Sequence, residues 1–225
     1  MLSNKVDSQN IFDSNIDSNY DYANLQHNLE NVVKRFIDVV CSMFLIMFFS
    51  PIFFFVAALI KLDSRGPVFF KQKRCGKMGK EFFMLKFRTM VDDAEILKKN
   101  LINEMEGPVF KIRRDPRITR IGSFLRRWSF DELPQFINIF KGEMSLVGPR
   151  PLAKEEMAGY EVWKDIRLTV KPGLTGLWQV YGRSTGKFSD WVKYDIEYVR
   201  NRSIFLDIKI IFLTVFAVLS KKGAC

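Results

Sequence analysis

The sequence predicts a mainly helical α+β protein that carries one membrane segment. Three observations support this fold class. Residues 39–60 form an uncharged, strongly apolar run; two short aromatic segments, PVFFKQKR and EFFMLKFRTM, flank a turn that contains two glycines; and most of the remaining segments have helical patterns. At 225 residues the chain is long enough for one domain with a core plus attachments.

The charge is unevenly distributed along the chain, and this indicates an anionic partner. The formal net charge is +10. Residues 1–33 hold one lysine against five acids, so they carry −4 and the rest of the chain carries +14. A strongly basic body next to an apolar segment indicates phospholipid headgroups, phosphates or nucleic acid as partners. Composition alone does not choose among these three.

Cysteine and histidine usage excludes several kinds of site. The three cysteines include no CxxC pair, which argues against a disulfide framework or a thiolate zinc site and suits a reducing compartment. The single histidine, His27, lies in the polar N-terminal segment. Any acid, base or nucleophile in the body of the protein must therefore be Asp, Glu, Cys, Ser, Lys or Tyr.

A polar tail and a membrane helix are expected first. Residues 1–31 are rich in Asn, Asp and Ser, which predicts a disordered or loosely attached tail. The 22 uncharged residues from Val39 to Ile60 are long enough to cross a hydrocarbon core of about 30 Å. Ser50-Pro51 falls in the middle of this run, where proline predicts a kink or break and a serine hydroxyl can satisfy the freed carbonyl. Basic residues on both sides leave a spanning and a re-entrant helix equally open.

A hairpin and then a series of helices are expected next. The two aromatic segments, separated by residues 75–79, predict a β-hairpin. The last apolar segment, 204–220, is short and contains Asp207 and Lys209, which favours an interfacial or core helix over a span. Between them, helices are expected at 92–105, from Pro116 to about Trp128, from Ser129 to about Phe140, at 152–164 and at 188–202.

The most informative stretch for chemistry is RRWSFDELPQF, residues 126–136. Ser129 and Glu132 have capping-box spacing, which predicts Ser129 as the N-cap and places Asp131 in the first helical turn. Two acids at a helix start are explained by the helix dipole alone. The nearby arginines add a functional interpretation, because a carboxylate at such a position is expected to stay ionised. Such a group can bind a divalent metal or attack phosphorus.

Two stretches rich in glycine and proline lie downstream. Gly148-Pro149-Arg150-Pro151 predicts a rigid turn that presents one arginine. In residues 170–183, a glycine-rich backbone lies between Lys171 and Arg183 and can hold a phosphate or nucleotide. In isolation, each pattern is more simply explained as a turn.

Taken together, these motifs carry a family resemblance. The chain resembles the monotopic phosphoglycosyl transferases, bacterial sugar transferases that start glycan assembly on a polyprenol phosphate. The resemblance runs from about Val32 to Cys225. It rests on six motifs in one order: Ser50-Pro51, KFRTM at 86–90, RDPRITRIG at 114–122, SFDELPQ at 129–135, SLVGPRP at 145–151 and KPGLTGLWQVYGR at 171–183.

The resemblance implies a role for each residue that matches a motif. Asp131 matches the nucleophile that takes the phosphosugar as a covalent aspartyl intermediate, and Mg²⁺ is expected to bind near it. Glu132 completes the catalytic dyad. The implied phosphate-binding residues are Arg126, Arg150, Arg183, Lys86 and Arg88. The implied nucleotide-region residues are Lys171, Gly173, Thr175, Gly176 and Gln179.

The resemblance also implies a domain plan and a location. Residues 32–62 are expected to form a re-entrant membrane helix broken at Ser50-Pro51, which places both flanks on the cytoplasmic side of the bacterial plasma membrane. A compact cytosolic catalytic domain is then expected at 63–203, and an amphipathic membrane-interface helix with the C-terminus at 204–225. Larger family members carry spanning helices and an extra domain before the catalytic part, so this chain is expected to be the minimal catalytic form.

The implied reaction moves a sugar-1-phosphate from a UDP-sugar to undecaprenyl phosphate and releases UMP. This is the first membrane step in assembling exopolysaccharide, capsule or lipopolysaccharide. The implied partners are the UDP-sugar donor, the polyprenyl phosphate acceptor, anionic membrane lipids and downstream glycosyltransferases. A homodimer is compatible with the resemblance, and no nucleic acid is expected.

Two other classes of function compete with an enzyme. A basic, membrane-tethered binder of nucleic acid or anionic lipid explains the charge and the apolar segment. It does not explain why Asp131 and Glu132 interrupt a basic helical region. A non-catalytic scaffold for glycan assembly is the third reading, and release of nucleoside monophosphate by the purified protein excludes it.

Overall fold

The computed structural model describes residues 4–104, 110, 112, 114–182 and 188–219. The chain divides into two compact units, Met1–Ile37 and Asp38–Cys225. The described backbone of the first unit is helical from Asn4 onward and belongs to the helix α1 (Asn4–Asp63). The disordered or loosely attached tail expected at 1–31 stays a prediction. Once a helix is nucleated, each added residue gains one backbone hydrogen bond, which extends the helix into a polar sequence.

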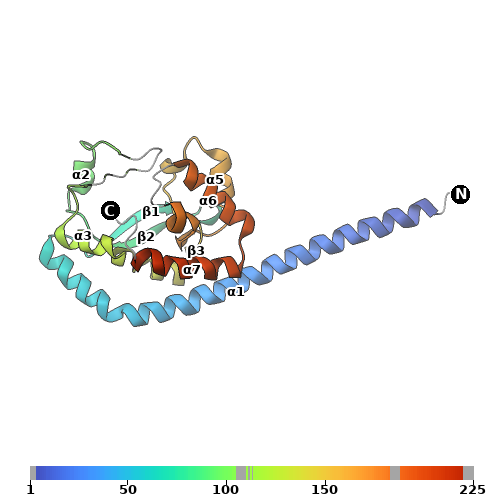
Figure 1. Cartoon of the computed structure of the whole chain (residues 1–225), viewed down its shortest axis with the longest axis horizontal. Helices are drawn as coiled ribbons and strands as arrows, with labels where there is room; N and C mark the ends of the chain where they lie inside the picture. The colour runs from blue at the N-terminus through green and yellow to red at the C-terminus, as the bar shows by residue number, and fades with distance from the viewer. Residues whose placement is uncertain (1–3, 105–109, 111, 113, 183–187, 220–225) are drawn as a thin grey trace. The chain divides into compact units, whose positions relative to one another are not determined.

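The apolar part of α1 is the membrane-segment candidate. Among the described residues, one helical stretch, Leu29–Asp63, is long and apolar enough to cross a membrane. The helix runs through Pro51 without interruption, and α1 changes direction in its light-blue to cyan part (Figure 1). The expected re-entrant course stays a prediction. Pro51 has no amide to donate to the Met47 carbonyl, and the Ser50 hydroxyl donates to that carbonyl at 2.8 Å. The expected serine compensation is therefore present.

The predicted hairpin is confirmed. Strands β1 (Phe69–Cys75) and β2 (Glu81–Phe87) pair antiparallel, with Phe69 opposite Phe87 and Cys75 opposite Glu81. The connection contains the short 3₁₀ turn η1 (Lys77–Gly79), where Met78 and Gly79 have positive φ. Phe82 and Met84 are buried on one face of β2, and Phe87, on the opposite face, is buried against α1, because side chains along a strand point to opposite faces.

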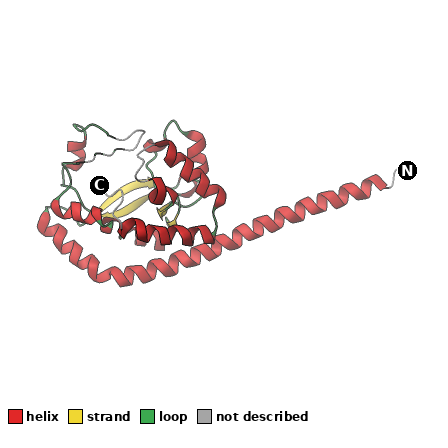
Figure 2. Cartoon of the chain, viewed as in Figure 1, coloured by secondary structure: helices red, strands yellow, loops and turns green. Residues whose placement is uncertain are grey.

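Helices and short turns make up most of the rest of the second unit (Figure 2). The helix expected at 92–105 is shorter in the structure and consists of α2 (Ala94–Lys98). None of the residues of α2 is buried, so packing does not stabilise a longer helix. The helix expected from Pro116 begins later, because Thr119 pairs with the Thr89 carbonyl and caps Gly122. The remaining elements are α3 (Arg120–Arg127), η2 (Phe130–Glu132), α4 (Gln135–Lys141), η3 (Glu155–Met157), α5 (Glu161–Arg167), η4 (Trp178–Gly182), α6 (Phe188–Asn201) and α7 (Ile204–Leu219).

A second, parallel strand pair was not predicted from the sequence. Strands β3 (Ser145–Val147) and β4 (Gly173–Thr175) lie side by side, and Gly148 continues the contact with β4. A Cβ added to Gly173 would lie 2.0 Å from the Gly148 nitrogen. The two backbones therefore approach more closely than any side chain would allow.

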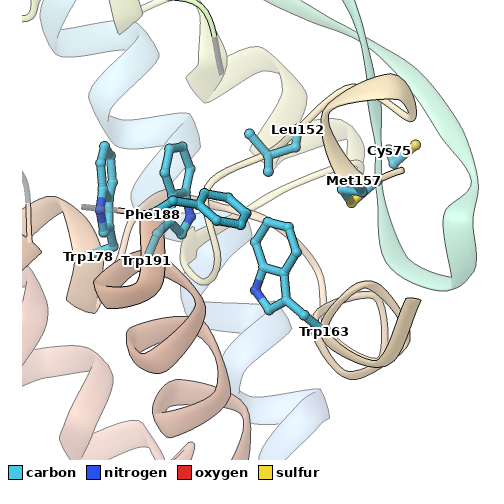
Figure 3. Packing of buried hydrophobic residues seen from close by; sticks show 7 residues of the cluster. All are labelled: Cys75, Leu152, Met157, Trp163, Trp178, Phe188 and Trp191. Carbon is cyan, nitrogen blue, oxygen red and sulfur yellow. The ribbon is translucent and has the colours of Figure 1, made fainter. Parts of the chain in front are cut away.

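Two buried clusters form the core of the second unit. One joins α1 to the hairpin and α3 through Val56, Ile60, Phe87 and Leu125. The other contains seven residues, and its rings come from α5, η4 and α6 (Figure 3). In it Trp178 and Trp191 stack with 3.9 Å between ring centroids, and Phe188 lies edge-on against Trp163.

Two buried carboxylates tie helices to the region of β3. Asp38, in α1, accepts hydrogen bonds from the Ser145 hydroxyl and the Leu146 amide. Asp207, in α7, accepts from the Tyr198 hydroxyl, which lies within hydrogen-bond distance of the Val147 carbonyl as well. Asp207, whose charge argued against α7 as a membrane span, is thus buried.

Both of these helices leave apolar side chains exposed. On α1 they include Phe44, Met47, Phe48, Phe54 and Phe55; on α7 they include Phe205, Ile208, Phe212, Val215, Phe216 and Leu219. Exposed apolar surface of this extent is typical of a protein that meets a membrane or a partner.

Candidate active site

The predicted acidic pair lies on the short turn η2, between α3 and α4. Ser129 has φ 57°, in the left-handed region, and its side chain makes no capping hydrogen bond, so the predicted capping box is wrong. Instead, the Glu132 amide donates to the Ser129 carbonyl. The Glu132 side chain is engaged by two cations, and charged hydrogen bonds of this kind are stronger than a capping bond.

A three-residue ion cluster forms around Glu132. Lys86 Nζ lies 2.8 Å and Arg150 Nη2 lies 3.0 Å from the same oxygen, Oε1 of Glu132. Lys86 comes from β2, which packs against η2, and Arg150 comes from the segment after β3. Residues that are far apart in the sequence are thereby brought to one place, as the family motifs implied.

The two acids have opposite pKa shifts. For Glu132, burial alone would raise the pKa, but the charges and hydrogen bonds of Lys86 and Arg150 outweigh it and hold the pKa well below its usual range. For Asp131, burial dominates and raises the pKa, aided by the adjacent Glu132 and opposed by Lys86 and Arg126. The pKa of Asp131 is thus shifted up and not down, because only 7% of the residue is exposed, and its expected ionised state near neutral pH stays a prediction.

Two further arginines reach the same region. Arg126 Nε donates to the Thr89 hydroxyl at 2.8 Å, which fixes its guanidinium beside the acids. Arg88 Nη2 donates to the backbone carbonyl of Ser64 at 2.7 Å, and a Cβ on Gly66 would collide with Arg88 Nη1. Arg88 is thus held at the end of α1.

These side chains line one cavity of about 430 Å³. This volume is within the range of small-molecule sites. Its wall contains seven of the predicted site residues: Lys86, Arg88, Arg126, Asp131, Glu132, Arg150 and Gln179. Among these seven, two acids lie with four basic side chains, and arginine and lysine are the side chains that bind phosphate oxygens.

The other predicted site residues lie elsewhere or outside the described residues. Gly173 and Thr175 belong to β4, and the Thr175 and Thr214 hydroxyl oxygens lie 2.6 Å apart. Gly176 packs against the Gly148 carbonyl. These residues and Lys171 do not line the cavity formed by the described chain, so their proposed nucleotide role stays a prediction. Arg183 lies outside the described residues.

Comparison with known proteins assigns the chain to a family. The model of the family described as bacterial sugar transferase matches residues 29–221. The chain belongs to this family. It is 44% identical to galactosyl transferase CpsE of Streptococcus agalactiae over 91% of this chain and 45% of CpsE. It is 41% identical to exopolysaccharide production protein ExoY of Rhizobium meliloti over 86% of this chain and 88% of ExoY.

A third relative has a more specific name. The chain is 41% identical to undecaprenyl-phosphate galactose phosphotransferase of Salmonella typhimurium, over 89% of this chain and 43% of that protein. The chain thus spans less than half the length of CpsE and of the Salmonella protein, and most of ExoY.

Sequence reasoning missed several residues of this sugar transferase cavity. Arg74, at the end of β1, forms an ion pair with Glu156 in the cavity wall. Trp178 and Trp191 also line it. Trp178 precedes Gln179 in a motif that was singled out, so position in the motif was a usable signal. Nothing in the local sequence around Arg74 or Trp191 indicated that tertiary packing brings them there.

The residues of the site fit a magnesium ion shared with a substrate. Among the described residues, no group of three or more His, Cys, Asp or Glu side chains is placed to hold a metal. Glu132 is occupied by two cations, which leaves Asp131 as the carboxylate of the pair without a salt bridge in the described part of the chain. Mg²⁺ is commonly bound by one or two carboxylates together with substrate phosphates and water, and this donor set suits that mode.

Proposed function

We propose that the protein is a polyprenyl-phosphate sugar-1-phosphate transferase. In this proposal a UDP-sugar donates its sugar-1-phosphate to undecaprenyl phosphate and UMP is released, as the first membrane step of bacterial glycan assembly. The observation that carries the proposal is the buried pair Asp131–Glu132 beside Lys86, Arg126 and Arg150 in one cavity, in a chain that belongs to the sugar transferase family. The name of the Salmonella relative supports the acceptor and the reaction class.

The first step is a displacement at phosphorus. An oxygen of Asp131 forms a bond to the phosphorus that carries the sugar, the bond from that phosphorus to the bridging oxygen breaks, and the electron pair leaves with UMP. Arg126 and Arg150 line the cavity and would neutralise phosphate oxygens in this step, so that one anion can approach another. When bound, Mg²⁺ would add further neutralisation of the diphosphate at Asp131.

The second step regenerates Asp131. A phosphate oxygen of the polyprenyl carrier attacks the same phosphorus, and the bond to Asp131 breaks as the aspartate takes back its electron pair. Neither step needs a proton to be moved, because the acceptor and the leaving group are both phosphates that ionise near neutral pH. This suits a chain whose single histidine is His27, and it suits a Glu132 held ionised by Lys86 and Arg150.

The exposed apolar faces of α1 and α7 support a membrane location. We place the catalytic unit on the cytoplasmic face of the bacterial plasma membrane, with α1 as a re-entrant helix and α7 at the interface. The basic body would meet anionic lipids, and the lipid product would pass to downstream glycosyltransferases. A homodimer is compatible with this arrangement.

The direct test is release of UMP by purified protein in lipid discs. A panel of UDP-sugars is supplied with undecaprenyl phosphate and Mg²⁺, and Asp131→Asn is compared with wild type. We expect release from one donor at least and a loss of about 1,000-fold or more in Asp131→Asn, because removing a nucleophile abolishes the step it performs. With donor alone, wild type should release about one equivalent of UMP and retain the phosphosugar on the peptide that contains Asp131.

Asp165→Asn is the matched control, because Asp165 is an exposed aspartate on α5. It should retain the activity of wild type. No UMP release from any donor by folded wild type would contradict the proposal and favour a tethered basic binding protein. Release that continues unchanged in Asp131→Asn would contradict the role of Asp131.

A further inference from the structure

Arg150 lies in a backbone segment that is held by hydrogen bonds from other parts of the chain. It lies between Pro149 and Pro151, neither of which has an amide hydrogen. The segment belongs to no helix or strand, so its carbonyls are satisfied from outside. The Pro149 carbonyl accepts from the Gly173 amide, and the Leu152 carbonyl accepts from the Cys75 amide.

The Arg150 carbonyl is held by a side chain. Arg167, at the end of α5, donates from Nη2 to this oxygen. Because the donor is a guanidinium, this is a charge-assisted hydrogen bond, which is stronger than a bond between neutral groups. The main chain of Arg150, whose side chain lines the cavity of about 430 Å³, is therefore held by Arg167, which does not line that cavity.

Arg167 is itself fixed by a buried environment. Its Nε lies 3.5 Å from Asp195 Oδ2, both side chains are 3% exposed, and its guanidinium lies 4.5 Å from the centre of the Trp163 ring. The Trp163 indole donates to the same Asp195 oxygen at 3.1 Å. Figure 3 shows Trp163 at the edge of the aromatic cluster that joins α5 to α6. The carboxylate, the ring and the guanidinium form one rigid assembly.

We propose that Arg167 and Asp195 are positioning residues that hold Arg150 where its guanidinium reaches Glu132. This inference rests on the proposed transferase function. The path runs from Asp195 to Arg167, from Arg167 to the Arg150 main chain, and from the Arg150 side chain to Glu132 at 3.0 Å. A purely structural role would require only that the pair be buried. A positioning role requires that its effect on the reaction pass through Arg150.

A double-mutant cycle separates the two roles. Arg167→Lys keeps a positive charge but replaces a planar fork with a point charge, which cannot bind Asp195 and the Arg150 carbonyl in the same way. We expect kcat for UMP release to fall about 10- to 100-fold, since a small misplacement of a catalytic group has an effect of this size. In an Arg150→Ala background the same substitution should cost less than about twofold, because the group that it positions is already absent.

Arg117 supplies a matched control. It is similarly buried, pairs with Asp115 at 2.6 Å and lies over the ring of Phe110. Arg117 lines the same cavity as Arg150, but its described contacts do not include Arg150. Arg117→Lys should therefore have the same effect in the wild-type and Arg150→Ala backgrounds. Equal losses for Arg167→Lys in both backgrounds would overturn the proposal.

A second variant and a second readout keep the test decisive. Asp195→Asn removes the charge that holds Arg167 while nearly preserving shape, and it carries the same cycle if Arg167→Lys does not fold. A wild type that releases no UMP would contradict the proposed function, not the positioning pair. In that case, the coupling between Glu132→Gln and Arg150→Ala is measured by thermal melting. The coupling should fall by at least half in an Arg167→Lys background, and an unchanged coupling overturns the proposal.

Discussion

Asp131 and Glu132 are neighbours in the sequence, yet their carboxyl pKa values shift in opposite directions. Burial raises the pKa of both acids. Of the two, however, it is Glu132 that lies within hydrogen-bond distance of Lys86 and Arg150. The sequence motifs predicted that these two acids and the arginines share one site. It did not show which acid receives the salt bridges, because that depends on the rotamers and burial that the fold imposes.

The salt bridges of Glu132 predict a stability that depends on pH. The pKa of Glu132 is lowered in the folded state, so its contribution is fully present above the unfolded value of 4.5 and is lost as the pH falls toward the folded value. Glu132→Gln should lower the free energy of unfolding at pH 7 by about 3 kcal/mol, because it leaves Lys86 and Arg150 without an anionic partner. Melting of both proteins in detergent between pH 3 and pH 8 measures the difference.

The difference between wild type and Glu132→Gln should shrink below about pH 4.5, because there the unfolded wild-type chain binds a proton at Glu132 that the folded protein does not bind. Glu161→Gln is the control, because Glu161 pairs with Lys164 on the exposed face of α5. Its effect should be within about 0.5 kcal/mol at every pH. A stability gap for Glu132→Gln that does not change with pH would show that packing, not charge, is lost.

At the scale of elements, the hairpin and the helices at 188–201 and 204–219 followed from local pattern, while the parallel pair β3–β4 did not. A three-residue strand has too few residues to show period-2 alternation. Its partner is a distant segment, and both segments looked like glycine turns in the sequence. The glycines are explained by backbone contact, since Gly148, Gly173 and Gly176 lie where any Cβ would overlap main-chain atoms.

This contact predicts the outcome of Gly173→Ala. The added Cβ meets Gly148 backbone, which cannot move without displacing the segment that carries Arg150. The free energy of unfolding should fall by about 1–3 kcal/mol, and UMP release should fall with it. Thermal melting and kinetics on the same preparation measure both.

Gly159→Asn is the matched control for Gly173→Ala. Gly159 has φ +84° with no atom within 4 Å of an added Cβ, and asparagine tolerates this backbone region. Its stability should stay close to that of wild type. If the predicted nucleotide role of Gly173 is the correct one, Gly173→Ala would raise KM for the donor while leaving the melting temperature unchanged.

At the scale of the whole molecule, the order of motifs predicted more than any single element. Seven of the predicted site residues, taken from four separate stretches, line one cavity. Local sequence pattern could not predict this grouping, because Lys86, Glu132 and Arg150 are brought together only by the tertiary fold. The course of the apolar helix was the least predictable feature. Its length suits a span, whereas its proline and two-sided basic flanks suit a return to the same side.

The proline inside α1 leads to a prediction about topology. In a chain with its native cysteines replaced, Ser8→Cys in the N-terminal segment and Lys77→Cys in the hairpin loop are labelled separately with a membrane-impermeant maleimide. A re-entrant helix should leave both positions unlabelled in spheroplasts and labelled in inverted vesicles. Labelling of Ser8→Cys in spheroplasts would contradict the re-entrant course.

The same measurement on Pro51→Leu tests the cause of that course. Leucine restores the amide that can donate to the Met47 carbonyl, so the helix no longer relies on the Ser50 hydroxyl and is expected to straighten. A straight apolar helix of this length favours a span, which would move Ser8→Cys to the periplasmic face while Lys77→Cys stays cytoplasmic. Unchanged labelling in Pro51→Leu would mean that tertiary contacts such as Asp38 with β3, and not the proline, determine the course of the helix.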